Sequence, residues 1–220
     1  MNQNKPQYHK EMEKIIESFG GERKSLLLHS CCAPCSSGVL VPFQEIFDLT
    51  VFYYNPNISE AEEYRRRAEE QKKLIAALNE EKPDFPIRII EEEYDPQTFY
   101  TSIKGLEKCP EGGDRCSVCY ELRLERTAQR AAQEGFDYFT TSLTISPMKN
   151  ADKLNTIGKQ LEERYGARFL PSDFKKKDGY KNSIRYSKEY DLYRQDYCGC
   201  IFSKMERLSQ TESLSKDNKI

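Results

Sequence analysis

Residues 25–35 read Ser25-Leu-Leu-Leu-His-Ser-Cys-Cys-Ala-Pro-Cys35, a short apolar run followed at once by three cysteines. A run of this length between polar flanks is typical of a strand that is buried on both faces of a sheet. In open parallel sheets, ligands bind beyond the carboxyl ends of the strands. The stretch therefore predicts a buried first strand that delivers thiols to an active site.

Strand and helix patterns alternate outward from this stretch. Strand patterns follow at 49–54, 87–90, 137–141 and 168–170, and helical patterns lie at 8–19, 36–47, 60–80, 96–103, 116–134 and 151–165. This alternation predicts an α/β fold with a mainly parallel, doubly wound (Rossmann-like) sheet and cysteine-rich loops at the strand C-terminal edge. We expect an N-terminal helix in residues 1–24, a catalytic α/β domain over 25–205, and a polar, frayed tail over 206–220.

Composition limits the class of protein. The chain has 220 residues, of which 37% are hydrophobic and 32% charged, and this suits one globular domain. It shows neither a long apolar span nor a signal peptide, so we expect a cytoplasmic protein with no membrane partner. The net charge of −2 means that any contact with nucleic acid must come from a local basic patch.

The eight cysteines are too few for a secreted disulfide scaffold of this length, and they fall into three clusters. The clusters are Cys31, Cys32 and Cys35; Cys109, Cys116 and Cys119; and Cys198 and Cys200. Clusters this far apart in sequence indicate a metal or redox site that the fold assembles. Two thiolates from a strand end and two from the first turn of a helix can surround one centre.

Four-cysteine ligation fits either zinc or an iron–sulfur cluster. Because Cys31 and Cys32 are adjacent, we favour a [4Fe–4S] cluster held by Cys31, Cys32, Cys116 and Cys119, with structural zinc as the alternative. Cys35 can replace one of the adjacent pair, bind a second metal or cap the next helix. Cys109 is either a bystander or a partner of Cys35.

The third cluster, Cys198-Gly-Cys200, is too closely spaced to supply two ligands to most mononuclear sites. A disulfide across one residue is strained, and strained disulfides are more oxidising and more labile. We therefore interpret the pair as a redox-active dithiol. The alternative is two free thiols, one of them a ligand.

Several long motifs in the same order resemble the QueH family of epoxyqueuosine reductases, from about Leu26 to about Ser203. The motifs are His29-Ser-Cys-Cys-Ala-Pro-Cys35, Tyr53-Tyr-Asn-Pro-Asn57, Cys116-Ser-Val-Cys119-Tyr-Glu-Leu-Arg123-Leu124, Thr141-Ser-Leu-Thr-Ile-Ser-Pro147 and Tyr193-Arg-Gln-Asp-Tyr-Cys-Gly-Cys200. The resemblance implies a cobalamin-independent oxidoreductase that reduces epoxyqueuosine in tRNA to queuosine, the last step of queuosine biosynthesis.

The same resemblance implies particular cofactors and partners. It places a [4Fe–4S] cluster on Cys31, Cys32, Cys116 and Cys119, and a redox-active disulfide on Cys198 and Cys200. It also implies an additional iron near the cluster. The expected partners are tRNA that carries epoxyqueuosine and an electron donor, with no role for DNA.

Other residues are weaker candidates. His29 is either an acid or a hydrogen-bonded core residue, and Tyr53, Tyr54, Tyr193 and Tyr197 are either proton donors and stacking groups or packing residues. A basic set with interleaved tyrosines is either a tRNA-phosphate contact or a solvated loop; it comprises Lys175, Lys176, Lys177, Lys181 and Arg185, with Tyr180 and Tyr186.

Two other functions compete with the reductase. An iron–sulfur tRNA sulfur-transfer enzyme would need a glycine-rich phosphate loop after the first strand, and that position holds cysteines instead. A zinc-stabilised RNA-binding module would contain zinc and show no redox chemistry.

Overall fold

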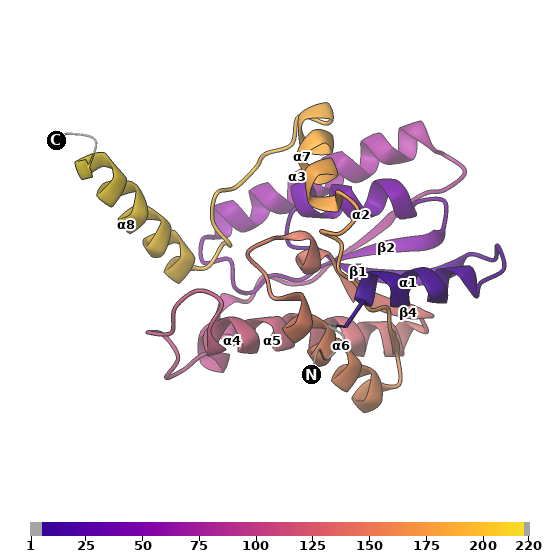
Figure 1. The fold of residues 1–220 in the computed structure, drawn as a ribbon, viewed down its shortest axis with the longest axis horizontal. Coiled ribbons are helices and arrows are strands. Elements are labelled where there is room, and N and C mark those ends of the chain that lie inside the picture. The colour runs from indigo at the N-terminus through magenta and orange to yellow at the C-terminus, as the bar shows by residue number, and fades with distance from the viewer. Residues whose placement is uncertain (1–5, 218–220) are drawn as a thin grey trace, which may run out of the picture.

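A computed structural model describes residues 6–217 and shows a five-stranded sheet covered by helices on both faces (Figure 1). The strands are β1 (Lys24–His29), β2 (Phe47–Tyr53), β3 (Arg88–Glu91), β4 (Tyr138–Thr141) and β5 (Arg168–Phe169). Their order is β3-β2-β1-β4-β5, and each neighbouring pair is parallel. The predicted fold class is confirmed.

The helices follow the alternation that the sequence predicts, with two additions near the end of the chain. They are α1 (Tyr8–Glu17), α2 (Ala33–Phe43), α3 (Ala61–Glu81), α4 (Pro96–Ser102), α5 (Asp114–Glu134), the 3₁₀ turn η1 (Ser142–Ile145), α6 (Ala151–Tyr165), α7 (Gly179–Glu189) and α8 (Ile201–Asp217).

The apolar run of β1 sits at the centre of two cores. Successive side chains of a strand point to opposite faces, so Leu26 and Leu28 pack in one core and Leu27 packs in the other. The first core takes its helical side chains from α1, α2 and α3, and the second takes them from α5 and α6. In Figure 1, α2 and α3 accordingly lie above the sheet, and α5 and α6 lie below it.

The strand order creates a topological switch point beside β1. From β1 the chain passes through α2 to β2 on one face, and it later reaches β4, the other neighbour of β1, after α5 on the opposite face. Connections that diverge in this way open a crevice at the carboxyl ends of the strands. Cys31 and Cys32 follow β1 directly and therefore lie at this switch point.

Helix α2 starts and ends earlier than the predicted range of 36–47. Cys32 is the N-cap residue and Pro34 lies in the first turn, where its missing N–H costs no hydrogen bond. Pro42 lies one residue before the end of the helix, and β2 already begins at Phe47.

Helix α7 was not predicted, because residues 179–189 show a polar pattern. It packs on α2 through small residues: a Cβ atom added at Gly38 would lie 3.1 Å from Ser183 Cβ and 3.2 Å from the Gly179 carbonyl. A larger residue at Gly38 would therefore hold the two helices apart.

Helix α8 continues to Asp217, into the range 206–220 where the sequence predicts a polar, frayed tail. The bounds of the three expected segments stay a prediction. Helix α8 projects from the body of the molecule in Figure 1. The expected outer segments 1–24 and 206–220 include residues 1–5 and 218–220, which lie outside the described residues.

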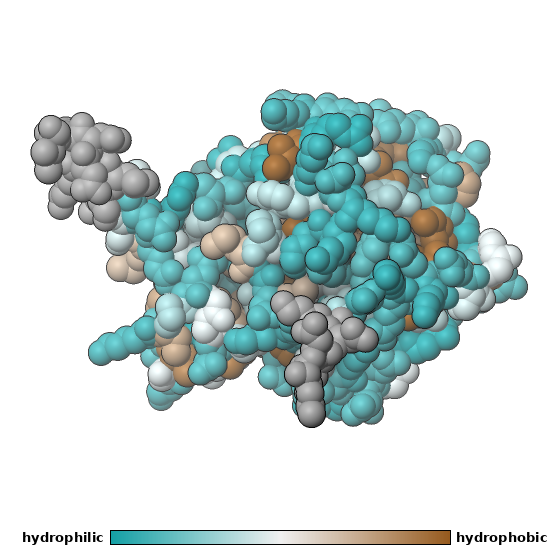
Figure 2. Space-filling model, in the orientation of Figure 1, coloured by the Kyte–Doolittle hydropathy of each residue, from teal (hydrophilic) through white to brown (hydrophobic). Residues whose placement is uncertain are grey.

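The face of the molecule in Figure 2 is mostly hydrophilic. Within residues 6–217, no helix combines the length and the apolar character needed to cross a membrane.

Candidate functional site

The first cysteine group lies between the end of β1 and the first turn of α2. Cys32 is 1% exposed, and its Sγ lies 3.8 Å from Cys31 Sγ. The Sγ atoms of Cys31, Cys32 and Cys35 all lie within 4.8 Å of one another. Hydrogen bonds from the other two thiols lower the pKa of Cys32 well below its usual range, and the same contacts raise the pKa of Cys35. One thiolate shared among three sulfur atoms is a favourable start for binding a metal ion.

Two cysteines of the second group, Cys116 and Cys119, lie in the first two turns of α5. Cys116 Sγ accepts a hydrogen bond of 3.2 Å from the backbone N–H of Gly112, and Cys119 is buried. Burial raises the pKa of Cys119 to about 12, so this side chain is a neutral thiol at physiological pH when no metal is bound. A bound cation would reverse that preference, because a coordinating thiol is deprotonated.

Arg115 holds the loop in front of α5 in place. Its guanidinium is 3% exposed and donates to the carbonyl oxygens of Glu107 and Cys109. It also lies 3.4 Å from a carboxylate oxygen of Glu206 on α8. One buried cation therefore joins the glycine-rich loop to the last helix.

The third cysteine group is held by a buried arginine of α3. Arg67 is 1% exposed, is paired with Glu63 at 2.7 Å, and donates from Nη1 to the carbonyl oxygen of Cys198 at 3.1 Å. Gly199 has φ +116°, and a Cβ atom there would lie 2.9 Å from Ile58 Cγ1. Glycine is required between the two cysteines both for the backbone angle and for this close approach.

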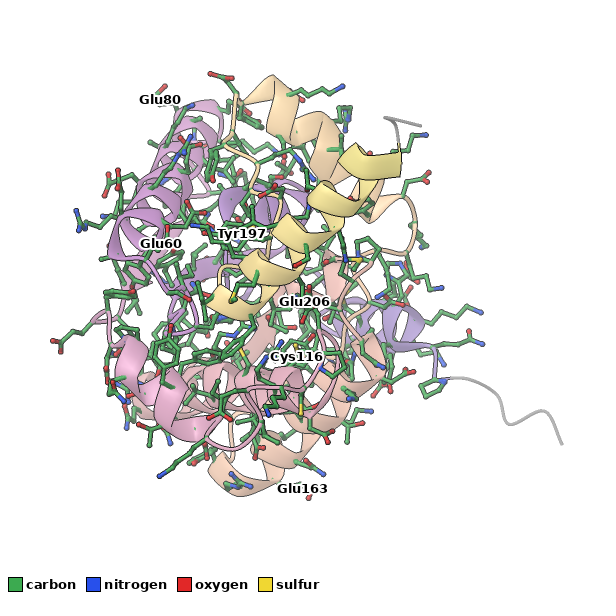
Figure 3. All side chains as sticks on the ribbon, turned by 90° about the vertical axis from the view of Figure 1, so that its left-hand side faces the viewer. Glu60, Glu80, Cys116, Glu163, Tyr197 and Glu206 are labelled. Atoms are coloured by element: carbon green, nitrogen blue, oxygen red, sulfur yellow. The ribbon has the colours of Figure 1, made fainter. Side chains whose placement is uncertain are left out.

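A pocket brings the second and third groups together. Cys116, Cys119, Cys198 and Cys200 all line it, with Asn57, Phe99, Glu111, Arg115, Tyr120, Arg123, Lys149 and Ser203. Figure 3 views the molecule from the side on which α8 projects and labels Cys116 on α5 and Tyr197 on the segment that leads into α8. The prediction that distant cysteines assemble in the fold is confirmed for these four.

Positive charge dominates the wall of this pocket. Arg115, Arg123 and Lys149 are 3%, 1% and 8% exposed, whereas Glu111 is the single carboxylate among the lining residues. Lys149 Nζ lies 3.0 Å from Cys198 Sγ and 3.5 Å from Glu111 Oε1. Buried cations are costly unless anions accompany them. The pocket is therefore suited to thiolates and to an anionic metal centre.

Cys31, Cys32 and Cys35 do not line this pocket, and Arg123 links the first group to it through charge. The charge of this guanidinium interacts with the thiols of Cys119, Cys198 and Cys31, one from each of the three sequence clusters. All eight cysteines are free thiols in the structure, so the pairing of Cys198 with Cys200 stays a prediction. Cys109 is not among the residues that line the pocket, and it contributes its backbone carbonyl to Arg115.

The four tyrosines named from the sequence have different surroundings. Tyr53 is fully buried and donates to the carbonyl oxygen of Tyr64, as a packing residue does. Tyr193 and Tyr197 lie near arginines, with Arg66 Cζ 3.4 Å from the ring centroid of Tyr193 and Arg67 Cζ 5.3 Å from that of Tyr197. Tyr54 lies beside His29 through its carbonyl oxygen.

The sequence interpretation gave no role to Lys149, Glu111, Arg115 or Arg123. Arg123 had a detectable signal, because it follows Cys119 by four residues and so shares its helix face. Lys149 lies in an irregular segment with no such spacing, and only the fold brings it to Cys198.

A parallel α/β sheet with a buried, many-thiol centre at its switch point defines a cysteine-dependent α/β protein. The comparisons with known proteins identify the family. A family model described as epoxyqueuosine reductase QueH matches residues 26–206. The chain belongs to this family, and the resemblance seen in the sequence is confirmed.

Curated relatives of the same name support the assignment. The Streptococcus pyogenes serotype M1 protein is 41% identical over all of this chain and 87% of its own length. The Staphylococcus epidermidis protein is 41% identical, with 99% and 92% covered, and the Thermotoga maritima protein is 37% identical, with 87% and 96% covered. A solved structure of the U34-tRNA thiolase NcsA from Methanococcus maripaludis with its [4Fe-4S] cluster shows a weaker likeness: its TM-score is 0.46 at 13% identity, with 96% of this chain and 73% of that chain covered.

His29 is a core residue with both ring nitrogens engaged. It is fully buried, with Nδ1 2.9 Å from Thr141 Oγ1 and Nε2 3.2 Å from the carbonyl oxygen of Tyr54. Because Thr141 Oγ1 also accepts from the Leu143 N–H, its own proton is directed at Nδ1, and Nε2 carries the proton donated to Tyr54. Burial, followed by the charge of Arg123, lowers the pKa of His29 to about 3. A neutral imidazole at neutral pH is unsuited to act as a general acid.

This burial predicts a pH dependence of stability. An unfolded histidine binds a proton near pH 6.5, whereas His29 in the folded protein stays neutral down to about pH 3. The free energy of unfolding should therefore fall as pH drops below about 6.5, by up to about 1.4 kcal/mol per pH unit from this residue. Urea unfolding of the reduced protein between about pH 7 and about pH 5 measures the slope. His29→Gln should flatten it, and His9→Gln is the matched control; equal slopes in the wild type and His29→Gln would contradict the assignment.

Proposed function

We propose that this protein reduces epoxyqueuosine in tRNA to queuosine, the last step of queuosine biosynthesis. The observation that carries the proposal is membership of the QueH family across residues 26–206. The buried thiols and cations of the pocket support it, because removal of an epoxide oxygen needs both electrons and groups that stabilise the leaving oxygen. Eight free thiols fit the reducing conditions of the cytoplasm, where we place the reaction.

We assign a [4Fe–4S] cluster to Cys31, Cys32, Cys116 and Cys119. The donor chemistry fits, because thiolates are the usual ligands of such clusters. The charge of the site fits as well, since three buried cations and one carboxylate line the pocket that holds Cys116 and Cys119. When bound, the cluster would supply one-electron chemistry.

Cys35 is a candidate ligand for the additional iron. Its Sγ lies within 4.8 Å of those of Cys31 and Cys32. Cys31 and Cys32 are assigned to the cluster, so Cys35 is the thiol of this group that remains for the additional iron. Thiolates also bind zinc, so metal analysis decides between iron and zinc.

Cys198 and Cys200 are the proposed source of the electron pair. Oxidation of two thiols to a disulfide releases two electrons and two protons. Removal of the epoxide oxygen consumes both, because two C–O bonds break, a C=C bond forms and the oxygen leaves as water. Lys149 Nζ donates a hydrogen bond to Cys198 Sγ at 3.0 Å, so a buried cation contacts one sulfur atom of the pair. An external electron donor must then reduce the disulfide before the next turnover.

The sulfur-transfer alternative lacks support in the residues after β1. That position is Ser-Cys-Cys-Ala-Pro-Cys35, with no glycine-rich cradle for the phosphates of ATP. Turnover in the absence of ATP distinguishes the reductase from this alternative.

We propose that the basic segment 175–185 contacts the phosphates of tRNA. The exposure and the acidic partners of its side chains indicate which of them contribute most. Lys176, Lys181 and Arg185 are exposed. Lys175 is paired with Asp173 at 2.9 Å and donates to the carbonyl oxygen of Thr144, and Lys177 is paired with Glu13. Cations without an acidic partner are the better phosphate ligands, so we expect the first three to contribute most.

Metal content tests the cluster assignment. Protein purified without oxygen should contain about four irons and four sulfides in its cluster, and Cys119→Ser should lose most of both. Cys109→Ser is the matched control, because that thiol is not part of the pocket lining and should leave the iron content unchanged. One zinc per chain with no sulfide would establish the zinc-stabilised module instead.

Turnover tests the reaction and the dithiol together. Reduced protein and tRNA that carries epoxyqueuosine should yield a nucleoside lighter by one oxygen atom, as measured by mass spectrometry. Cys198→Ser and Cys200→Ser should each abolish turnover, the first included, while the iron content stays at the wild-type level. Iron lost in proportion to activity would make that cysteine a ligand rather than an electron carrier, and an untouched epoxide with the wild type would reject the reaction.

Salt-dependent binding tests the tRNA contact. The double variant Lys176→Gln/Lys181→Gln should bind tRNA more weakly, and the slope of log K against log salt should fall by about 1 for each lysine that no longer neutralises a phosphate. The matched control is Lys24→Gln/Lys82→Gln, which removes the same charge where β1 begins and where α3 has ended before β3. Identical slopes for the two double variants would mean that the segment is a solvated surface.

A further inference from the structure

Arg123 is the most completely buried cation of the pocket, and its surroundings are unusual for a structural arginine. It is 1% exposed and lies on α5, one turn after Cys119. Its Nε donates to the carbonyl oxygen of Cys119 at 3.1 Å. A structural arginine in a protein interior normally has a carboxylate partner. Arg67 in this chain has one, in Glu63 at 2.7 Å.

The two terminal nitrogens of Arg123 have no hydrogen-bond partner in the described part of the chain. Both Nη1 and Nη2 are buried, so water in bulk does not satisfy them. Leaving buried charged donors unpaired is costly, and arginine cannot lose its proton to escape that cost. The buried position therefore calls for an anion or acceptor that comes to the guanidinium.

The charges near Arg123 also indicate that an anion binds beside it. Lys149 also lines the pocket, and the two cations repel each other. The groups that favour the charge of Arg123 are thiols: Cys119, Cys198 and Cys31, one from each cysteine cluster. Cys119 and Cys198 line the same pocket as this guanidinium, which is a fork of N–H donors with a fixed shape.

We propose that Arg123 is a positioning residue that donates hydrogen bonds to the sulfur atoms of the iron–sulfur centre and raises its reduction potential. The proposal rests on the [4Fe–4S] cluster assigned under the proposed function. It goes further by naming a side chain that sets the reduction potential of that cluster. Hydrogen bonds to the sulfurs and the net charge near a cluster are two of the factors that determine its potential.

The sign of the effect follows from charge. A [4Fe–4S] core with four thiolates is an anion, and reduction adds one more negative charge. A buried cation stabilises the reduced form more than the oxidised form, and the interior screens the interaction less than water does. Removal of the charge should therefore make the centre harder to reduce.

The experiment is a redox titration of anaerobically prepared protein, followed by electron paramagnetic resonance of the reduced centre. Arg123→Gln keeps a polar side chain and removes the charge, and Arg123→Lys keeps the charge but loses the fork of donors. Arg130→Gln is the matched control: it removes the same charge two turns further along α5, from a side chain that is paired with Glu92 and Glu134 and is not part of the pocket lining.

We expect Arg123→Gln to shift the reduction equilibrium at least tenfold toward the oxidised centre, which is 59 mV for a one-electron couple. Arg123→Lys should give a smaller shift in the same direction, and Arg130→Gln should match the wild type. If Arg123→Gln does not hold iron, Arg123→Lys decides the question by the same shift. Wild-type potentials in every variant that holds iron would overturn the proposal. So would loss of iron from both Arg123 variants, because lysine keeps the charge.

This outcome is separable from that of the proposed reaction. The titration needs only a loaded centre and no tRNA, so a shifted potential in a protein that leaves epoxyqueuosine unchanged would reject the reaction and support the role of Arg123. Unchanged potentials in a protein that turns over the substrate would support the reaction and reject the role of Arg123.

Discussion

Buried positive charge among thiols is the constraint around which the site is arranged. Arg115, Arg123 and Lys149 reach the pocket from α5 and from the segment before α6, and Arg67 joins them from α3 to hold the backbone of Cys198. Cations in a protein interior need counter-charge or well-placed acceptors. Thiolates, carbonyl oxygens and a few carboxylates supply part of that need, and an anionic centre would supply the remainder.

The sheet makes this site possible because the connections on the two sides of β1 run over opposite faces. Helix α2, which follows the first cysteines, and helix α5, which carries Cys116 and Cys119, pack on opposite faces of the sheet. The third group comes from outside the sheet and is tied to α3 and α5 by the arginines at 67 and 115. Rigid strands thus set the position of the first thiols, and buried side-chain contacts fix the last ones.

Much of this architecture was predictable from local patterns, because β1 is a clear apolar run and its cysteines follow at once. The parallel character of the sheet also follows from the alternation of strands and helices. The residues that line the pocket were harder to predict from the sequence. Lys149 contacts Cys198 although 49 positions separate them in the chain, and no sequence spacing indicates that contact. Helix α7 was missed because close packing at Gly38, rather than an apolar stripe, holds it in place.

The late position of the third cysteine group affects the order in which the protein matures. All five strands end by Phe169, whereas Cys198 and Cys200 follow about 30 residues later along the chain. Since domains form from the N-terminal side during synthesis on the ribosome, the sheet can close while the last thiols are still within the ribosome. The four proposed cluster ligands, Cys31, Cys32, Cys116 and Cys119, are therefore made before Cys198 and Cys200, and this pair joins the site only once Arg67 contacts the Cys198 backbone.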